Sequence, residues 1–261
     1  MPKAVFFDLD GTLIDSTTRS IHDSSKLAIA KLKENGYKVA IASGREINGI
    51  CDIEGLDVTQ FDGFVLSNGA TVLDETHCCI SSHPFSSDSV KKILEYGEKH
   101  DMALVFETTD QRFAATDYNA YLMRSKEYYH EETPLRRNWT GEEIVKINAF
   151  QEEGMDFSEL LQDVELEILA CPTCCYDIFP KGVSKAVGIH TMMQYWGFQA
   201  DDYICFGDHE NDTEMICNAR VGVAVKDACG SKELQRIAPF LCEASGKGGI
   251  YQFLLEHHYI R

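Results

Sequence analysis

The chain has 261 residues, of which 44% are apolar and 25% charged, and these ordinary globular values exclude a chain that is disordered throughout. Its 42 acidic residues against 24 Lys and Arg give a net charge of −18, which disfavours nucleic acid and anionic membranes as partners because both attract positive charge. No apolar segment is long enough to span a bilayer, so we expect neither nucleic acid nor a membrane as a partner.

The start of the chain does not have the pattern of a signal peptide, because Asp8 interrupts its apolar run very early. The ten cysteines are scattered along the chain. Without a secretion signal, such cysteines are expected to be free thiols in a reducing compartment. The sequence therefore predicts a cytoplasmic protein, and it does not indicate an oligomeric state.

The first part of the chain alternates between buried strands and helix. Three apolar runs predict strands, at residues 3–9, 37–42 and 64–67. Between the first two, Ala28, Ile29 and Leu32 mark one face of a helix that ends near Gly36. Strands that alternate with crossover segments predict βαβ units and a parallel sheet.

The middle of the chain has a different pattern. An amphipathic helix lies around 90–97, and shorter strand-like runs follow at 103–106 and 166–170. This mixture of helix and strand is long enough to form a domain of its own. Candidate substrate contacts there are the polar residues Glu107, Asp110 and Arg112.

The first pattern then returns. A helix is predicted over 185–195, followed by buried strands at 203–206 and 221–225. We therefore predict an α/β fold in which a Rossmann-like parallel sheet is interrupted by an inserted α+β domain. The predicted boundaries are residues 1–83 and 182–261 for the sheet domain and 84–181 for the insertion.

Four polar turns are expected at one edge of this sheet, where open α/β sheets bind their ligands. They follow four of the predicted strands, at residues 8–12, 43–45, 68–69 and 207–208. They would bring Asp8, Asp10, Asp208 and Asp212 together, and four carboxylates repel one another unless a cation lies among them. Oxygen ligands shared with a substrate phosphate indicate Mg²⁺. Each aspartate taken alone could instead be a turn residue or a helix N-cap.

These motifs resemble those of the haloacid dehalogenase-like (HAD) hydrolases, and more narrowly of the Cof-type sugar-phosphate phosphatases with a C2B-type cap. The family's four motifs match Asp-x-Asp-Gly-Thr at 8–12, Ser43 in Ser-Gly-Arg, Lys185 in Gly-Val-Ser-Lys and Gly-Asp-x-x-Asn-Asp at 207–212. They occur in the family's order, with the inserted segment, the cap, between the second and the third. The resemblance covers essentially the whole chain and implies a HAD core with a cap.

The resemblance implies a catalytic role for four residues. Asp8 would attack phosphorus and form an aspartyl-phosphate. Asp10 would protonate the leaving alkoxide and then accept a proton from water, for which it must start protonated beside the other negative charges. Ser43 would donate to a phosphate oxygen, and Lys185 would neutralise the charge of phosphate and Asp8.

The resemblance also implies ligands for substrate and metal. Gly44 and Asn211 would join Ser43 and Lys185 in binding the phosphate. Asp8, Asp208 and the backbone carbonyl of Asp10 would hold Mg²⁺, supported by Asp212. The expected activity is the Mg²⁺-dependent hydrolysis of a small phosphorylated metabolite, and the expected substrate class is sugar phosphates. A phosphomutase and a non-catalytic metabolite-binding protein on the same fold are the alternatives.

Several residues keep two interpretations. Arg45 could contact substrate or belong to the scaffold, and Asn68-Gly69 is interpreted as a structural turn beside the site. Lys181 competes with Lys185 for the role of the motif lysine. The cysteines at 171–175 have part of a zinc-site spacing, but no second pair follows, so a hairpin turn at Pro172-Thr173 is favoured and no zinc is expected.

Overall fold

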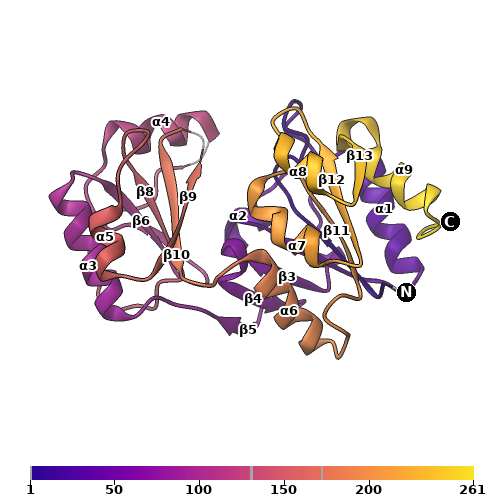
Figure 1. Cartoon of the computed structure of the whole chain (residues 1–261), viewed down its shortest axis with the longest axis horizontal. Helices are drawn as coiled ribbons and strands as arrows, with labels where there is room; N and C mark the ends of the chain where they lie inside the picture. Colours follow the sequence, from indigo (N-terminus) through magenta and orange to yellow (C-terminus); the bar gives the residue numbers. More distant parts are fainter. Residues whose placement is uncertain (1, 130–131, 172) are drawn as a thin grey trace. The chain divides into compact units, whose positions relative to one another are not determined.

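The computed structural model describes residues 2–129, 132–171 and 173–261, and the chain divides into two compact units (Figure 1). The larger unit consists of Met1–Ser81 and Ser184–Arg261, and the smaller one of Ser82–Val183. Each unit has its own β-sheet. We propose that they correspond to the core and the inserted cap that the sequence predicts.

The larger unit is built on an eight-stranded sheet in the order β13-β12-β11-β1-β2-β3-β4-β5. Its strands are β1 (Ala4–Phe7), β2 (Lys38–Ala42), β3 (Gly63–Leu66), β4 (Thr71–Asp74), β5 (Cys79–Ser82), β11 (Tyr203–Gly207), β12 (Val221–Lys226) and β13 (Phe240–Glu243). The neighbouring pairs from β13 to β3 are parallel, which confirms the predicted α/β fold with a parallel-sheet core. β4 runs antiparallel to β3, an extension of the sheet that the sequence analysis did not predict.

Helices cover both faces of this sheet (Figure 1). They are α1 (Asp23–Glu34), α2 (Ile47–Cys51), α6 (Lys185–Tyr195), α7 (Thr213–Asn218), α8 (Lys232–Ile237) and α9 (Gly249–Glu256). Because side chains alternate along a strand, Val5 and Phe7 of β1 join one apolar cluster with α1 and α9, while Ala4 and Phe6 join another with α6 and α7. Burial on both faces explains why β1 is a continuous apolar run.

Four short 3₁₀ helices complete the larger unit, namely η1 (Val58–Gln60), η2 (Ser67–Gly69), η3 (Glu210–Asp212) and η4 (Ser245–Lys247). Two of them, η2 and η3, follow the strands β3 and β11 directly. The turn η2 makes the tight reversal into β4 possible, because Ser67, Asn68 and Gly69 all have positive φ angles.

The smaller unit has a five-stranded antiparallel sheet in the order β7-β6-β8-β10-β9. Its elements are α3 (Ser87–Lys99), β6 (Ala103–Glu107), β7 (Arg112–Ala114), α4 (Ala120–Tyr129), β8 (Lys146–Phe150), α5 (Ser158–Asp163), β9 (Leu166–Cys171) and β10 (Cys175–Pro180). Helices α3 and α5 pack with one apolar cluster of the sheet, and Leu122 of α4 belongs to another. β9 and β10 form a hairpin with Thr173 in its turn, whereas Pro172 lies outside the described residues.

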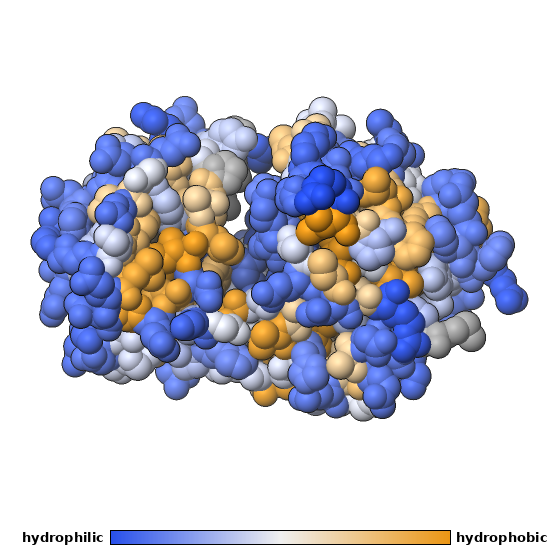
Figure 2. Space-filling view, viewed as in Figure 1, coloured by the Kyte–Doolittle hydropathy of each residue, from blue (hydrophilic) through white to orange (hydrophobic). Residues whose placement is uncertain are grey.

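Hydrophilic side chains surround both units on the face drawn in Figure 2, with apolar side chains in patches between them. The central strands of both sheets are buried. Among the described helices, none combines the length and the apolar character needed to cross a membrane.

Candidate active site

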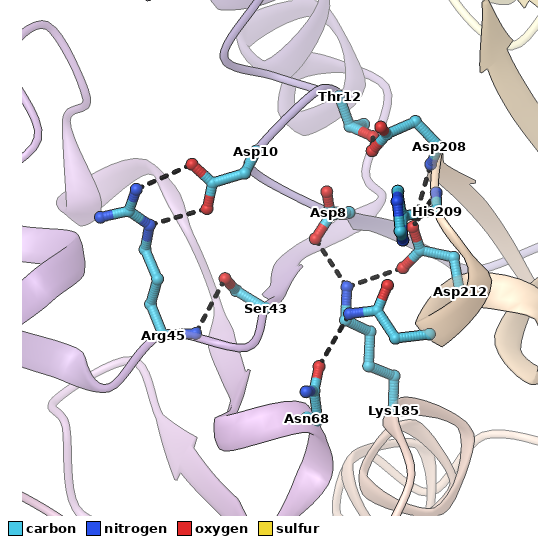
Figure 3. Close-up of polar contacts among 11 residues, drawn as sticks. Asp8, Asp10, Thr12, Ser43, Arg45, Asn68, Lys185, Asp208, His209 and Asp212 are labelled. Carbon is cyan, nitrogen blue, oxygen red and sulfur yellow. Dashed lines mark hydrogen bonds and ion pairs between the residues drawn. The ribbon is translucent and has the colours of Figure 1, made fainter. Parts of the chain in front are cut away.

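The candidate site lies where β11, β1, β2 and β3 end. These four strands are neighbours in the sheet, in that order. The polar turns that follow them therefore meet at one edge, as the strand pattern predicts (Figure 3). The site belongs wholly to the larger unit.

Lys185 is the centre of the polar contacts. Its side chain is fully buried, and its Nζ donates to Asp8 Oδ1 at 2.6 Å and to Asp212 Oδ1 at 2.7 Å. Burial alone would lower the pKa of this lysine, but the carboxylates of Asp212 and Asp8 outweigh that effect and hold the pKa above its usual value. Lys185 is therefore a permanent positive charge between two carboxylates.

Lys185 is placed by the start of α6. Ser184 is the N-cap of this helix, and its hydroxyl accepts from the backbone N–H of Val187. Gly69 lies against this helix start so closely that a Cβ there would be 2.0 Å from the Ser184 carbonyl oxygen. The glycine thus lets the end of β3 and the start of α6 approach each other.

Asp8, Asp208 and Asp212 form a buried cluster in which one oxygen from each lies within 4.8 Å of the others. Burial raises the pKa of Asp8 to about 7, partly opposed by Lys185. Burial, with Asp8 and Asp212 nearby, raises the pKa of Asp208 to about 9. Fully ionised, the three carboxylates would exceed the one ammonium of Lys185 by two negative charges, and the raised pKa values of Asp8 and Asp208 show that this state is unfavourable without further positive charge. The donor set fits a divalent cation with oxygen ligands, because such a cation would balance this charge.

The loop after β11 fixes the two later aspartates. Asp212 Oδ2 accepts from the backbone N–H groups of Asp208 at 2.9 Å and His209 at 3.1 Å. Thr12 donates its hydroxyl to Asp208 Oδ1 at 3.1 Å. At Gly11, which has φ +86°, a Cβ would lie 2.2 Å from Asp208 Oδ2. The glycine of the first motif is thus needed both for its turn and for the approach of Asp208.

Asp10 points away from Asp8 and toward Arg45 (Figure 3). The Arg45 Nε donates to Asp10 Oδ2 at 2.7 Å, and its Nη2 donates to Oδ1 at 2.8 Å. The Asp10 side chain is 54% exposed, and it is not part of the buried carboxylate cluster. Arg45 is therefore paired with the predicted acid–base residue. Its contact with substrate stays a prediction.

Ser43, Gly44 and Asn211 lie next to Arg45 or Asn68. The buried Ser43 hydroxyl accepts from the backbone N–H of Arg45 at 3.2 Å. Asn211 donates to the side-chain oxygen of Asn68 at 2.9 Å. A Cβ on Gly44 would lie 3.3 Å from that same oxygen. Asn68 thus links the ends of β2 and β3 to the loop after β11.

Asn68 and Thr12 are contacts that the sequence analysis missed. Asn68 is buried and left-handed, with φ 53°, and the sequence indicated only a turn there. Its position at a strand end, level with the other motifs, was the available signal. Thr12 was recognised as part of a motif without a contact of its own.

The remaining candidates lie elsewhere. Lys181 is 61% exposed and pairs with Glu165 at 3.6 Å. In the smaller unit Glu107 is buried and Asp110 is exposed. Cys171 and Cys175 lie near Asp177 as a possible ligand group, and this third partner was not predicted from the cysteine spacing.

Comparisons with known proteins find similarity over nearly the whole chain. The sequence model of the haloacid dehalogenase-like hydrolases matches residues 5–254. The chain is 28% identical over 273 residues to YitU of Bacillus subtilis strain 168, named as a 5-amino-6-(5-phospho-D-ribitylamino)uracil phosphatase, with 98% of this chain and 97% of YitU covered.

Solved structures share the fold. A hypothetical protein from Geobacillus kaustophilus HTA426 has a TM-score of 0.88 and 27% identity, with 100% of both chains covered. BT1666 from Bacteroides thetaiotaomicron, described as one of the HAD phosphatases, has a TM-score of 0.89 at 22% identity and covers 100% of this chain and 96% of its own. At that identity the second comparison supports the fold alone.

Proposed function

We propose a function that starts from one premise: the chain belongs to the haloacid dehalogenase-like hydrolase family, as its motifs predict. The prediction of a phosphatase of this family is confirmed at the level of the family. The further proposal is Mg²⁺-dependent hydrolysis of a small phosphomonoester through an aspartyl-phosphate on Asp8. The observation that carries it is Lys185, buried between Asp8 and Asp212 in a cluster whose three carboxylates, when ionised, exceed its one ammonium by two negative charges.

In this proposal Asp8 attacks the phosphorus atom. Its Oδ1 is held by Lys185 at 2.6 Å, so we assign the attack to Oδ2. The P–O bond to the alcohol breaks, and Asp10, which must be protonated at this point, gives its proton to the leaving alkoxide. Asp10 then takes a proton from the water that attacks the aspartyl-phosphate, which releases phosphate and restores Asp8. For both steps Asp10 must turn from Arg45 toward Asp8.

Asp8, Asp208 and the carbonyl oxygen of Asp10 are the residues that would hold Mg²⁺. Bound there, the ion would supply positive charge for the phosphoryl oxygens and for Asp8. Asp212 is better suited to support: its Oδ1 accepts from Lys185 and its Oδ2 from two backbone N–H groups. Such outer contacts hold the ligands in place.

Ser43, Gly44, Lys185 and Asn211 are proposed to bind the phosphate. Ser43 offers a buried hydroxyl and Lys185 a permanent charge. The sugar-phosphate class is supported by the motifs and by YitU, whose name describes a phosphorylated ribityl compound. Because every phosphomonoester shares the reacting group, we propose that the smaller unit, at Ser82–Val183, sets the preference among substrates. A cytoplasmic location stays a prediction.

A chromogenic phosphate ester tests the proposal. The purified chain should release phosphate with Mg²⁺, and it should lose this activity in excess chelator. Asp8→Asn should be inactive, while Asp23→Asn, a change of the same kind at an exposed residue of α1, should be fully active. Activity of Asp8→Asn, or none in the unaltered chain with Mg²⁺ and a panel of sugar phosphates, would contradict it.

A sugar bisphosphate separates the alternatives. Given a sugar monophosphate and a trace of the bisphosphate, a phosphomutase would return the phosphoryl group to the sugar, so an isomeric monophosphate would appear in place of free phosphate. A binding protein would raise its melting temperature with the ligand and release nothing.

A further inference from the structure

The hairpin of the smaller unit sets two cysteines face to face. β9 ends at Cys171 and β10 begins at Cys175, and these two residues are direct partners in the antiparallel register. All ten cysteines of the chain are thiols in this structure. Cys175 is buried and Cys171 is partly buried, in an apolar cluster with Leu122 of α4. The hairpin therefore holds a pair of thiols that no step of the proposed hydrolysis uses.

The register places this pair within reach of a covalent link. Directly opposed residues of antiparallel strands have Cα atoms about 4.5 or 5.5 Å apart, depending on the pair type. A disulfide needs about 4.4–6.8 Å between Cα atoms, so both pair types qualify. The two Sγ atoms lie within 4.8 Å of each other. A hydrogen bond with the Cys171 thiol, together with burial, raises the pKa of Cys175, which indicates that the side chains point toward each other.

A metal ion fits this group poorly, although Asp177 is the third member. Asp177 Oδ2 pairs with the Nζ of Lys146 at 3.1 Å, and its Oδ1 accepts from Asn148. Lys146 is buried, and Asp177 and Glu107 keep its pKa above the usual value against the effect of burial. A fixed ammonium beside the sulfurs opposes a divalent cation.

The neighbouring thiol is less well placed. Cys174 precedes Cys175 directly and lies in the turn with φ 58°, where no strand register sets it opposite a partner. Thr173, also in the turn, contacts the hydroxyl of Ser125 on α4 at 3.0 Å. The turn is thus anchored to the helix, while the strand ends hold Cys171 and Cys175 together.

We propose that Cys171 and Cys175 are a reversible oxidation site that forms a disulfide with a two-electron oxidant of the peroxide class. The more exposed Cys171 reacts first: its thiolate attacks one oxygen of hydrogen peroxide, the O–O bond breaks, and a sulfenic acid and hydroxide form. The Cys175 thiol loses its proton as its sulfur attacks that of Cys171, the S–S bond forms, and the S–O bond breaks to release a second hydroxide. With the two thiol protons, the sum is two thiols and one peroxide giving a disulfide and two waters.

Peptide mapping of the full chain tests this. Trypsin leaves Cys171, Cys174 and Cys175 in one peptide, residues 147–181, because no Lys or Arg lies between its ends. After a short exposure to hydrogen peroxide and alkylation of the remaining thiols, this peptide should carry one alkyl group. Its mass should be two hydrogens below that of the same peptide with one alkyl group and two free thiols. Dithiothreitol before alkylation should restore three alkyl groups.

Matched serine variants assign the pair. Cys174→Ser should still form the link, whereas Cys171→Ser and Cys175→Ser should not. Fragmentation of the unaltered peptide makes the same assignment without a variant. The proposal is overturned if all three thiols stay alkylable, if the link requires Cys174, or if peroxide gives only sulfinic or sulfonic acids. It is also overturned if the purified protein holds one zinc per chain that protects these thiols until a chelator removes it.

Discussion

Replacing Lys185 by Met should reduce both the stability and the activity of the protein. The substitution keeps a long side chain in a fully buried position but removes the ammonium that lies 2.6 Å from Asp8 and 2.7 Å from Asp212. At an effective dielectric constant of about 20, each contact has a Coulomb energy of about 6 kcal/mol. Much of that energy is offset in the variant, because no ammonium group has to be removed from water and buried. Breaking a buried pair from one side costs about 3–5 kcal/mol.

The matched control is Lys181→Met. Lys181 is 61% exposed and pairs with Glu165 at 3.6 Å, and exposed pairs contribute about 0–1 kcal/mol. Urea unfolding in chelator should therefore show a loss of about 3–5 kcal/mol for Lys185→Met and almost none for Lys181→Met. Mg²⁺ should recover part of the loss, because it supplies positive charge to the same carboxylates.

The assay for function is hydrolysis of the chromogenic ester with saturating Mg²⁺. We expect Lys185→Met to lose about a hundredfold or more in kcat, the scale for removing an electrostatic group from the transition state. Lys181→Met should be unchanged. Equal activity of the two folded variants would refute the assignment of Lys185, and so would full activity of Lys185→Met at a temperature where circular dichroism shows it folded.

Three further predictions concern the metal, pH and Arg45. Mg²⁺ should support activity and Ca²⁺ should inhibit it, because Ca²⁺ prefers looser and higher coordination; an equal rate with either ion would contradict this. Burial raises the pKa of Asp8 to about 7 and of Asp208 to about 9, so the cation-free folded state binds more protons than the unfolded chain. Its melting temperature in chelator should fall between about pH 5 and pH 9, and Mg²⁺ should raise it most at the alkaline end; a rise with pH in chelator would refute the charge argument. Arg45→Met should change the stability by less than about 1 kcal/mol, since its pair with Asp10 is partly exposed, and a larger loss in thermal unfolding would show a structural role.

The sequence allowed the edge of the sheet to be predicted because that inference is local. Each of β11, β1, β2 and β3 is an apolar run followed by a polar turn, and parallel order follows from the crossovers between them. The antiparallel β4 was missed because it depends on the left-handed turn at Ser67–Gly69. Sequence spacing did not predict that Ser67 and Asn68, which are not glycines, would adopt positive φ angles.

Contacts between distant segments were beyond local reasoning for a different reason. Asn68 and Asn211 are 143 positions apart, and their hydrogen bond exists only because β3 and the loop after β11 end at the same edge. Cys171 and Asp177 are close in the sequence, but the β9–β10 hairpin is what brings them into one group of ligands. The spacing of cysteines alone did not include an aspartate from the next strand.

Asp10 shows how far a motif determines geometry. Residues two apart in a strand point to the same side, and this led to the expectation that Asp8 and Asp10 reach one site. But β1 ends at Phe7, and Asp10 lies in the turn before Gly11, whose φ is +86°. From there its carboxylate reaches Arg45, which follows β2. While its carboxylate accepts these two charge-assisted hydrogen bonds, Asp10 cannot donate a proton to the leaving group. Each turnover in the proposed mechanism must therefore separate this pair, and the free energy of doing so belongs to the barrier.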